Sequence, residues 1–273
     1  MSLFSIDVQK CKRDGLCAAE CPMGLIDMQE EGFPNPVPSA EELCVNCGHC
    51  VAVCPHGALA LKTMKPEDCP SVNKQLILTP EHAEHFLRYR RSIRNYRSKP
   101  VDRGVIGELI RMASYAPSGH NLQPVHWLAI DDPAELSRLA GLVIGFMRMM
   151  IKDHPEVAGP MHFDRVVNAW EKGFDRILRG APNVLVAHGV QSLGTAQPSS
   201  IIALTYLELA ATSLGLGTCW AGYFNAAATF YPPMMEALAL PQGHQSFGAM
   251  MVGYPKYVYQ RLPLRNAPKI RWR

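Results

Sequence analysis

The sequence has little net charge, no tract of low complexity and no long run of residues that are all apolar. Its formal charge is +3 over 273 residues, and no basic stripe is interleaved with aromatic residues, so nucleic acid is not expected as a partner. The first ten residues, MSLFSIDVQK, lack the apolar core of a secretory signal peptide. Residues 199–222 are mostly apolar, but Glu208 near their middle favours a buried helix over a membrane span. The absence of these features predicts a cytoplasmic protein with neither a membrane nor a nucleic acid as partner.

Cysteine, by contrast, is concentrated in two short runs. Seven of the nine cysteines lie in CKRDGLCAAECP (residues 11–22) and CVNCGHCVAVCP (residues 44–55). The second run has the spacing C-x2-C-x2-C-x3-C-P, and the first has the same spacing with Asp14 in place of its second cysteine. In this pattern three cysteines of one run bind one iron–sulfur cluster and the fourth binds the other. Zinc is the alternative, but it takes four tetrahedral ligands, commonly from paired CxxC units, so the spacing favours iron–sulfur clusters.

Over about the first 60 residues the two runs resemble the two-cluster bacterial ferredoxins. The resemblance implies two clusters, one held by Cys11, Asp14, Cys17 and Cys54, and the other by Cys44, Cys47, Cys50 and Cys21. Carboxylate is a harder ligand than thiolate and should hold its iron less firmly. The cluster at Asp14 is therefore expected to interconvert between [4Fe–4S] and [3Fe–4S] forms, as in ferredoxins with C-x2-D. The alternative is a solvated aspartate beside a permanent three-iron cluster.

The length leaves room for one further domain with its own core. We predict domain limits at 1–61 and 80–273, joined by a proline-punctuated linker at 62–79. Thr79 and Asp102 are expected to cap two helices. Further helices are predicted over 133–151, 162–179, 199–214 and 232–240, and strands over 125–130, 183–190 and 246–254. Several helices around a few strands indicate an α+β domain behind the small two-cluster domain.

Four stretches of the second domain resemble, in order, the signatures of the FMN-dependent nitroreductase family. They are RYRRSIRNYRSKPV (88–101), APSGHNLQPVHW (116–127), GLGTCWAGYF (215–224) and GYPKYVYQRLPLRNAPKI (253–270). Guanidinium groups can grip a phosphate in bidentate fashion, and a cation beside the flavin stabilises its reduced anion. The residues that the resemblance assigns to FMN are Arg90, Arg91, Ser92, Arg94, Pro117, Ser118, Gly119, Asn121, Ala221, Gly222 and Arg265, with Arg261 as the alternative to Arg265.

The resemblance also implies a homodimer with two FMN sites at the subunit interface. Ser118 and Asn121 would then come from the subunit opposite Arg90, the apolar helix 199–214 would lie near the seam, and the backbone N–H of Ala221 would address the flavin N5.

The function implied is that of an iron–sulfur flavoprotein that passes electrons from the clusters to FMN and on to a small acceptor. That acceptor would be nitro-bearing or otherwise unsaturated and electrophilic. No GxGxxG motif is present, so ferredoxin and NAD(P)H both stay candidate donors, and no catalytic side chain is expected because the cofactors carry the chemistry. The alternatives are an ene-reductase or reductive dehalogenase on the same flavin, and an electron-transfer or redox-sensing protein that relays charge to a protein partner.

Overall fold

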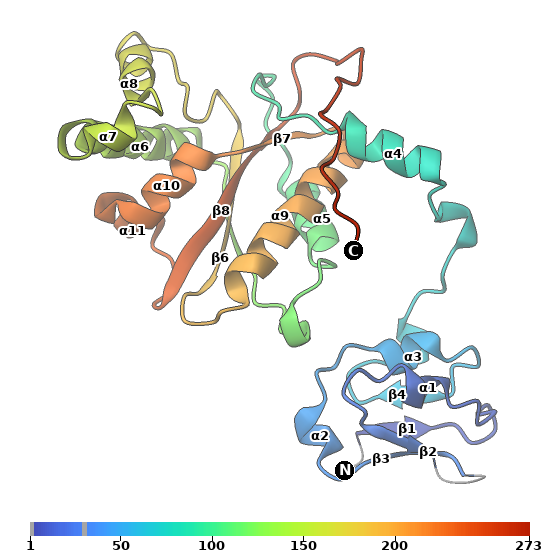
Figure 1. Cartoon of the computed structure of the whole chain (residues 1–273). Helices are drawn as coiled ribbons and strands as arrows, with labels where there is room; N and C mark the ends of the chain where they lie inside the picture. Colours follow the sequence, from blue (N-terminus) through green and yellow to red (C-terminus); the bar gives the residue numbers. More distant parts are fainter. Residues whose placement is uncertain (1–2, 29–31) are drawn as a thin grey trace. The chain divides into compact units, whose positions relative to one another are not determined.

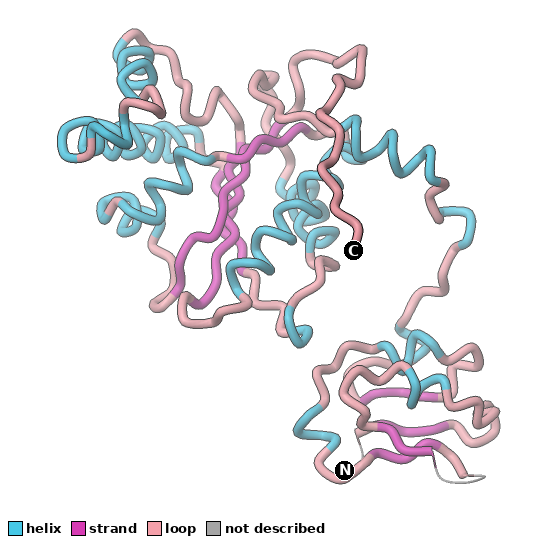
Figure 2. The backbone as a smooth tube through the Cα atoms, in the orientation of Figure 1, coloured by secondary structure: helices cyan, strands magenta, loops and turns pink. Residues whose placement is uncertain are grey.

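The computed structural model describes residues 3–28 and 32–273, which divide into two compact units (Figures 1 and 2). The N-terminal unit ends at Ile77 and takes in the short segment His120–Leu122, and the second unit comprises Leu78–Gly119 and Gln123–Arg273. The division at Ile77 falls inside the segment that we predicted as linker. The limits 1–61 and 80–273 stay predictions.

The N-terminal unit is built from two short antiparallel strand pairs and three helical turns. Its elements are β1 (Phe4–Ile6), α1 (Leu16–Ala19), β2 (Ile26–Met28), β3 (Pro34–Pro36), α2 (Ala40–Leu43), α3 (His49–Val53) and β4 (Leu59–Leu61). Strand β1 pairs with β4, and β2 pairs with β3, both in antiparallel fashion. The apolar core is small because the unit is short. Its buried members are Phe4, Cys17, Ile26, Val51, Leu59 and Leu61.

The two cysteine runs fold as repeats of one backbone conformation. Gly15 and Gly48 both have φ 74° immediately before a helix that carries a cysteine at its second position. Two residues earlier, Arg13 and Asn46 are also left-handed, with φ 57° and 51°. Glycine adopts this region without steric cost. Asp14 therefore occupies the position in its loop that Cys47 occupies in the other.

The second unit is centred on one antiparallel sheet in the order β5-β6-β8-β7 (Figure 1). The strands are β5 (His126–Ile130), β6 (Asn183–Val190), β7 (Gly217–Trp220) and β8 (His244–Gly253). Its helices are α4 (Pro80–Tyr89), α5 (Arg103–Ala113), α6 (Pro133–Asp153), α7 (Pro155–Ala158), α8 (Phe163–Glu171), α9 (Ala196–Ala211), α10 (Gly222–Phe230) and α11 (Pro232–Leu238).

Both faces of this sheet are buried, so the central strands are apolar at consecutive positions. On β6, Val184 and Val186 pack with the helices α6, α8, α10 and α11, whereas Leu185 and Ala187 pack with α5 and α9. All four are fully buried. Figure 1 shows these two helix groups on opposite sides of the sheet. The α+β class is confirmed, and the layered core explains why NVLVA shows no alternation of polar and apolar residues.

The helix starts follow the predicted caps. The Thr79 hydroxyl accepts from the His82 N–H at 3.3 Å, and the Asp102 carboxylate accepts from the Gly104 N–H at 2.7 Å. Helix α8 ends at Glu171, well before the predicted residue 179. Gly173, two residues later, has φ 80°, and the chain then runs as a loop to β6. The prediction of a helix through residue 179 is therefore wrong.

The short helix α7, the strand β7 and the helix α10 had no counterpart in the sequence-based prediction. Strand β7 is only four residues long, and α10 follows it after a single residue. Their sequence, GTCWAGYFNAAATF, reads as a glycine-containing loop followed by small residues. Its structure is fixed by pairing of β7 with β8 and by burial of Phe224 and Ala227. No helix in the described part of the chain is both long enough and apolar enough to cross a membrane.

Candidate functional site

The first candidate site is a cavity beside the first cysteine run, which we call the Asp14 cavity. It is lined by Cys11, Asp14, Cys17 and Cys54, the four side chains predicted to hold one cluster. Cys54 comes from the second run, 37 positions beyond Cys17 in the chain, and reaches the cavity at the end of α3. The fold thus brings together the set of ligands that the resemblance implied.

An equivalent cavity, the Cys47 cavity, lies beside the second run. It is lined by Cys21, Cys44, Cys47 and Cys50. Burial raises the pKa of the Cys50 thiol to about 11, and the negative charges of Cys47 and Cys21 act in the same direction. Cys21 of the first run thus lines the cavity of the second run, and Cys54 of the second run lines the cavity of the first.

The last cysteine of each run accepts an equivalent hydrogen bond at its sulfur. The Leu25 N–H donates to Cys21 Sγ at 3.3 Å, and the Ala58 N–H donates to Cys54 Sγ at the same distance. Bonds of this kind stabilise a thiolate. At the position where the two runs differ, Asp14 Oδ1 accepts from the Leu16 N–H at 3.2 Å. That bond occupies one carboxylate oxygen.

The donor sets fit iron–sulfur clusters. Among the residues that the structure describes, no three His, Cys, Asp or Glu side chains converge on one point where a single ion could bind. A cluster makes a different demand, because each ligand binds its own iron and the ligands surround the cluster. Four ligands around each of two adjacent cavities meet that demand, one set with four thiols and the other with three thiols and a carboxylate.

The predicted flavin segment, residues 90–94, lies along the edge strand β7. The Ile93 N–H donates to the Thr218 carbonyl at 2.8 Å, and Ser92 forms a parallel bridge with Thr218. A side chain at Gly217 would collide with Ile93, so the glycine allows this close approach. The segment thereby extends the sheet by one short strand-like stretch.

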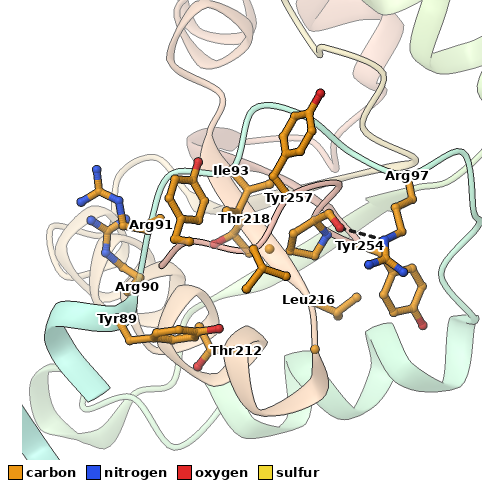
Figure 3. Close-up of a pocket in the computed structure, with 15 residues that line it drawn as sticks. Tyr89, Arg90, Arg91, Ile93, Arg97, Thr212, Leu216, Thr218, Tyr254 and Tyr257 are labelled. Atoms are coloured by element: carbon orange, nitrogen blue, oxygen red, sulfur yellow. Dashed lines mark hydrogen bonds between the residues drawn. The ribbon is translucent and has the colours of Figure 1, made fainter. Parts of the chain in front are cut away.

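One end of this segment borders a cavity of about 260 Å3, which we call the tyrosine cavity (Figure 3). Arg90 and Arg91 lie at one side of it and Arg97 at the other (Figure 3). The Arg97 Nε donates to the Pro255 carbonyl at 3.0 Å. The remaining polar lining includes Tyr89, Thr212, Thr218, Tyr254, Tyr257 and Tyr259.

A buried carboxylate already holds one of these arginines. Arg90 Nη1 donates to Glu208 Oε1 at 2.9 Å, and Trp220 Nε1 donates to Glu208 Oε2 at 3.4 Å. Glu208 belongs to α9 and is 6% exposed. The sequence shows Glu208 only as a single acid in an apolar helix, which is the signal that could have predicted a buried ion pair. Arg91 and Arg97 form no ion pair with a described residue.

The other end of the segment borders a second cavity of about 570 Å3, which we call the arginine cavity. Arg94 lines it together with Ala221 and Gly222, so the structure brings these three predicted residues into one site. Arg176 and Arg179 also line it, although the sequence-based reading placed both in a helix. Burial raises the pKa of the Cys219 thiol in its wall, and the positive charges of Arg94 and Arg179 oppose that effect.

The expected role of the Ala221 amide needs a correction. Its N–H donates to the Ala249 carbonyl at 2.8 Å, because β7 still pairs with β8 at this point. It is therefore not free to address a ligand. Gly222 begins α10, and the N–H groups of a first helical turn have no partner within the helix. The amide to consider is that of Gly222.

The second predicted signature, Pro117 to Asn121, borders neither of these two cavities. Ser118 Oγ accepts from the Gln123 N–H at 2.9 Å, and a Cβ on Gly119 would lie 2.8 Å from Thr195 Cγ2. His120 and Asn121 have φ of 52° and 53°, a conformation that costs free energy outside glycine. A role at a partner subunit's flavin stays a prediction.

The last predicted phosphate ligands lie in the C-terminal segment, which has no regular secondary structure after β8. Arg265 and its alternative Arg261 are both exposed there and line neither cavity. Tyr254, Pro255 and residues 257–259 of the same segment do line the tyrosine cavity. The structure therefore brings neither arginine to the tyrosine cavity or the arginine cavity.

Comparisons with known proteins agree with this geometry. The nitroreductase family matches residues 87–254, and the 4Fe–4S dicluster domain matches residues 10–58. An NADH dehydrogenase of Thermus thermophilus is 29% identical over 202 residues, which are 67% of this chain and 92% of that relative.

Two solved structures share the fold. A nitroreductase with bound FMN from Desulfitobacterium hafniense DCB-2 superposes with a TM-score of 0.57 at 20% identity, over 71% of this chain and 99% of that one. A second nitroreductase with bound FMN, from Bacteroides fragilis NCTC 9343, gives 0.56 at 20% identity, over 70% and 98%. Both resemblances read from the sequence are confirmed: the chain belongs to the nitroreductase family, as an oxidoreductase with an N-terminal 4Fe–4S dicluster domain.

Proposed function

We propose that this chain is an oxidoreductase that uses FMN and two iron–sulfur clusters to reduce a small nitro-bearing or otherwise unsaturated, electrophilic acceptor. The observation that carries the proposal is the course of residues 90–94. This segment runs along β7 from the tyrosine cavity, bordered by Arg90 and Arg91, to the arginine cavity, bordered by Arg94. A molecule with a phosphate at one end and a planar ring at the other fits such a pair of cavities.

The residues present fit FMN. Arg91 and Arg97 supply guanidinium donors for the phosphate in the tyrosine cavity, where Arg90 is held by Glu208. Arg94 supplies a positive charge in the arginine cavity. Gly222, which also lines this cavity, begins the first turn of α10, where backbone N–H groups have no partner within the helix. Both contributions favour negative charge on a bound ring. FMN is bound in the two similar structures, which supports the same cofactor here.

The bound groups supply the electron chemistry, since iron–sulfur clusters transfer single electrons and a flavin accommodates one or two. The chain's own residues bind and orient. The sulfur-directed N–H groups of Leu25 and Ala58 stabilise thiolate ligands. Reduced cysteine ligands suit a reducing compartment, and we place the protein in the cytoplasm.

The proposed assembly is a homodimer. Ile201, Ile202 and Tyr206 on α9 are 43%, 36% and 41% exposed, although this helix is apolar on almost every side. A second copy is the occupant that the family resemblance implies for this face. Sedimentation analysis tests it: a monomer that retains one FMN per chain would contradict the shared site.

Two electron donors are consistent with the chain. The Thermus relative carries the name NADH dehydrogenase, which supports a nicotinamide donor at the flavin. The dicluster domain supports a one-electron protein donor such as ferredoxin, and a donor tethered to its acceptor has a high effective concentration. We favour entry of electrons through the clusters.

The decisive experiment uses the intact chain, purified without oxygen. Iron, sulfide and FMN are counted, and turnover of a nitro-aromatic acceptor is followed with reduced ferredoxin and with NADH in parallel. A Cys47→Ala variant should lose ferredoxin-driven turnover while it keeps FMN. Equal rates with every donor in the variant and the parent would show that the clusters are structural or sensory. Reduction of the flavin without turnover of any small acceptor would favour an electron-transfer protein instead.

A further inference from the structure

The arginine cavity contains more positive charge than a flavin ring requires. Arg94, Arg176 and Arg179 all line it, and none of the three has a carboxylate within ion-pair distance among the described residues. Elsewhere in the second unit such pairing is common. The arginines that do pair with a carboxylate are Arg88, Arg90, Arg103, Arg111, Arg138 and Arg148.

The loop that carries two of these arginines is held in a defined conformation. Asp175 Oδ1 accepts from the N–H groups of Ile177 and Leu178 at 2.7 and 3.0 Å. The side chains of Ile177 and Leu178 are 3% and 2% exposed and anchor the loop in the core. Arg179 has φ 59°, a conformation that costs free energy for any residue other than glycine. The anchored loop thus presents Arg176 and Arg179 at the cavity.

The rest of the lining of this cavity is largely apolar and aromatic. Phe146, Met150, Phe163, Tyr223 and Phe230 line it from α6, α8 and α10. The rings of Phe163 and Tyr223 pack edge to face, with centroids 5.8 Å apart. A ligand that satisfies both kinds of lining has an apolar, planar body and an anionic group.

The flavin phosphate does not account for these charges. FMN carries one phosphate, and the tyrosine cavity at the other end of residues 90–94 already offers Arg91 and Arg97 to it. Arg94, Arg176 and Arg179 instead line the same cavity as Cys219 and Gly222, where α10 begins.

We propose that Arg176 and Arg179 form the binding site for an anionic group on the electron acceptor, so that the enzyme selects planar, unsaturated acceptors that carry a carboxylate or a similar oxyanion. The inference rests on the proposed function, because it assigns the flavin ring and its acceptor to the arginine cavity. The guanidinium fork binds a carboxylate in bidentate fashion and orients the acceptor. The two residues act as binding residues for the substrate.

The test compares two acceptors that differ in charge but scarcely in shape, 4-nitrobenzoate and 4-nitrobenzamide. The variant is Arg176→Gln combined with Arg179→Gln in the full chain with its cofactors. Removal of two charge-assisted contacts should raise the KM for 4-nitrobenzoate by about tenfold or more. The KM for 4-nitrobenzamide should change less than about twofold, since it makes no ionic contact. The pair Arg176→Lys and Arg179→Lys should recover part of the selectivity, and Arg138→Ala, which removes a distant paired charge, should leave it unchanged.

A second readout needs no turnover. Benzoate and benzamide are titrated into the oxidised parent protein and followed by calorimetry. Benzoate should bind at least about tenfold more tightly than benzamide in the parent and lose that preference in the glutamine variant. If neither nitro compound is reduced but benzoate still binds selectively, the proposed function fails and the anion site stands.

Three outcomes would overturn the inference. Equal losses for the charged and the neutral acceptor would show that the substitutions only distort the cavity. A loss of FMN affinity in the glutamine variant would show that Arg176 and Arg179 hold the cofactor phosphate. No preference for benzoate over benzamide in the parent would show that the two arginines are simply solvated.

Discussion

The two units of this chain differ in the size of their apolar core and in how far their stability depends on a cofactor. The N-terminal unit has a core of six buried side chains, and its eight predicted ligands line two cavities at its centre. The second unit has a sheet covered on both faces, with Leu185, Val186 and their neighbours fully buried, and its tyrosine and arginine cavities are both lined in part by the edge strand β7. A small unit depends on metal ligation for stability, whereas a large core is stable before any cofactor binds.

The largest effect should come from removal of iron. Treatment with a chelator under mild oxidation should unfold the N-terminal unit, because metal binding contributes directly to the folding free energy of so small a domain. Cleavage within residues 3–77 should accelerate by about tenfold or more, while the second unit stays protected. Limited proteolysis followed by mass spectrometry measures both. Protein whose clusters have been reconstituted serves as the control. Equal protection of the N-terminal unit with and without iron would contradict the proposed contrast between the units.

In the second unit, loss of the cofactor should leave the fold intact. Arg94→Ala should weaken FMN binding by about 1.5–3 kcal/mol, since it removes a charge-assisted contact. Far-ultraviolet circular dichroism and the cluster content should not change. Arg94→Lys, which keeps the charge, should lose less affinity than Arg94→Ala. Unchanged FMN affinity and reduction potential in the alanine variant would contradict the assignment of Arg94 to the flavin.

The second unit should also have its own acid-sensitive site, away from the cysteines. Burial lowers the pKa of His188 to about 4, and the charges of His244 and His126 contribute in the same direction. The His188 Nδ1 and His244 Nδ1 atoms lie 3.0 Å apart. Because the unfolded chain binds this proton more readily than the folded one, the free energy of unfolding should fall as pH decreases from about 6.5 toward 4.

The expected loss across that range is about 2.5 kcal/mol. Urea unfolding followed by tryptophan fluorescence between about pH 7.5 and 5.5 should show the free energy of unfolding beginning to fall. The matched variant His188→Gln removes the titrating group, so its stability should depend less on pH, and any acid loss of clusters is common to both proteins. Parallel pH profiles for the parent and the variant would exclude His188 as the cause.

The smallest effect concerns the one position at which the two cysteine runs differ. Asp14→Cys should convert the Asp14 cavity into an equivalent of the Cys47 cavity, because the backbone around both positions is the same. Under mild oxidation the parent should lose roughly one iron per chain from that cluster, and the variant should retain it. Iron analysis and electron paramagnetic resonance measure the difference. Identical behaviour of the two proteins would show that Asp14 does not bind iron.

The sequence predicted what is local. Caps at Thr79 and Asp102, the buried run NVLVAHGV and the spacing of the cysteines are each determined by a few adjacent residues, and the structure contains the corresponding helices, strand and grouped thiols. Short elements without such signals were not predicted. Strand β7 pairs with β8, and helix α10 packs in the core. Helix α8 ends at Glu171, shortly before Gly173 adopts φ 80° and Asp175 accepts from the N–H groups of Ile177 and Leu178.

The candidate site shows the same division. The sequence by itself determined the residue types of the flavin segment, from Arg90 to Arg94. The spacing of the cysteines likewise indicated that each run supplies its last cysteine to the cluster of the other run. Only the tertiary structure decided that Arg90 pairs with Glu208, that the Ala221 N–H is taken by Ala249, and that Arg176 and Arg179 face the cavity beside Arg94. Each of these depends on contacts between residues at least 28 positions apart. Such contacts are set by the packing of helices on the sheet, which no local pattern of residues specifies.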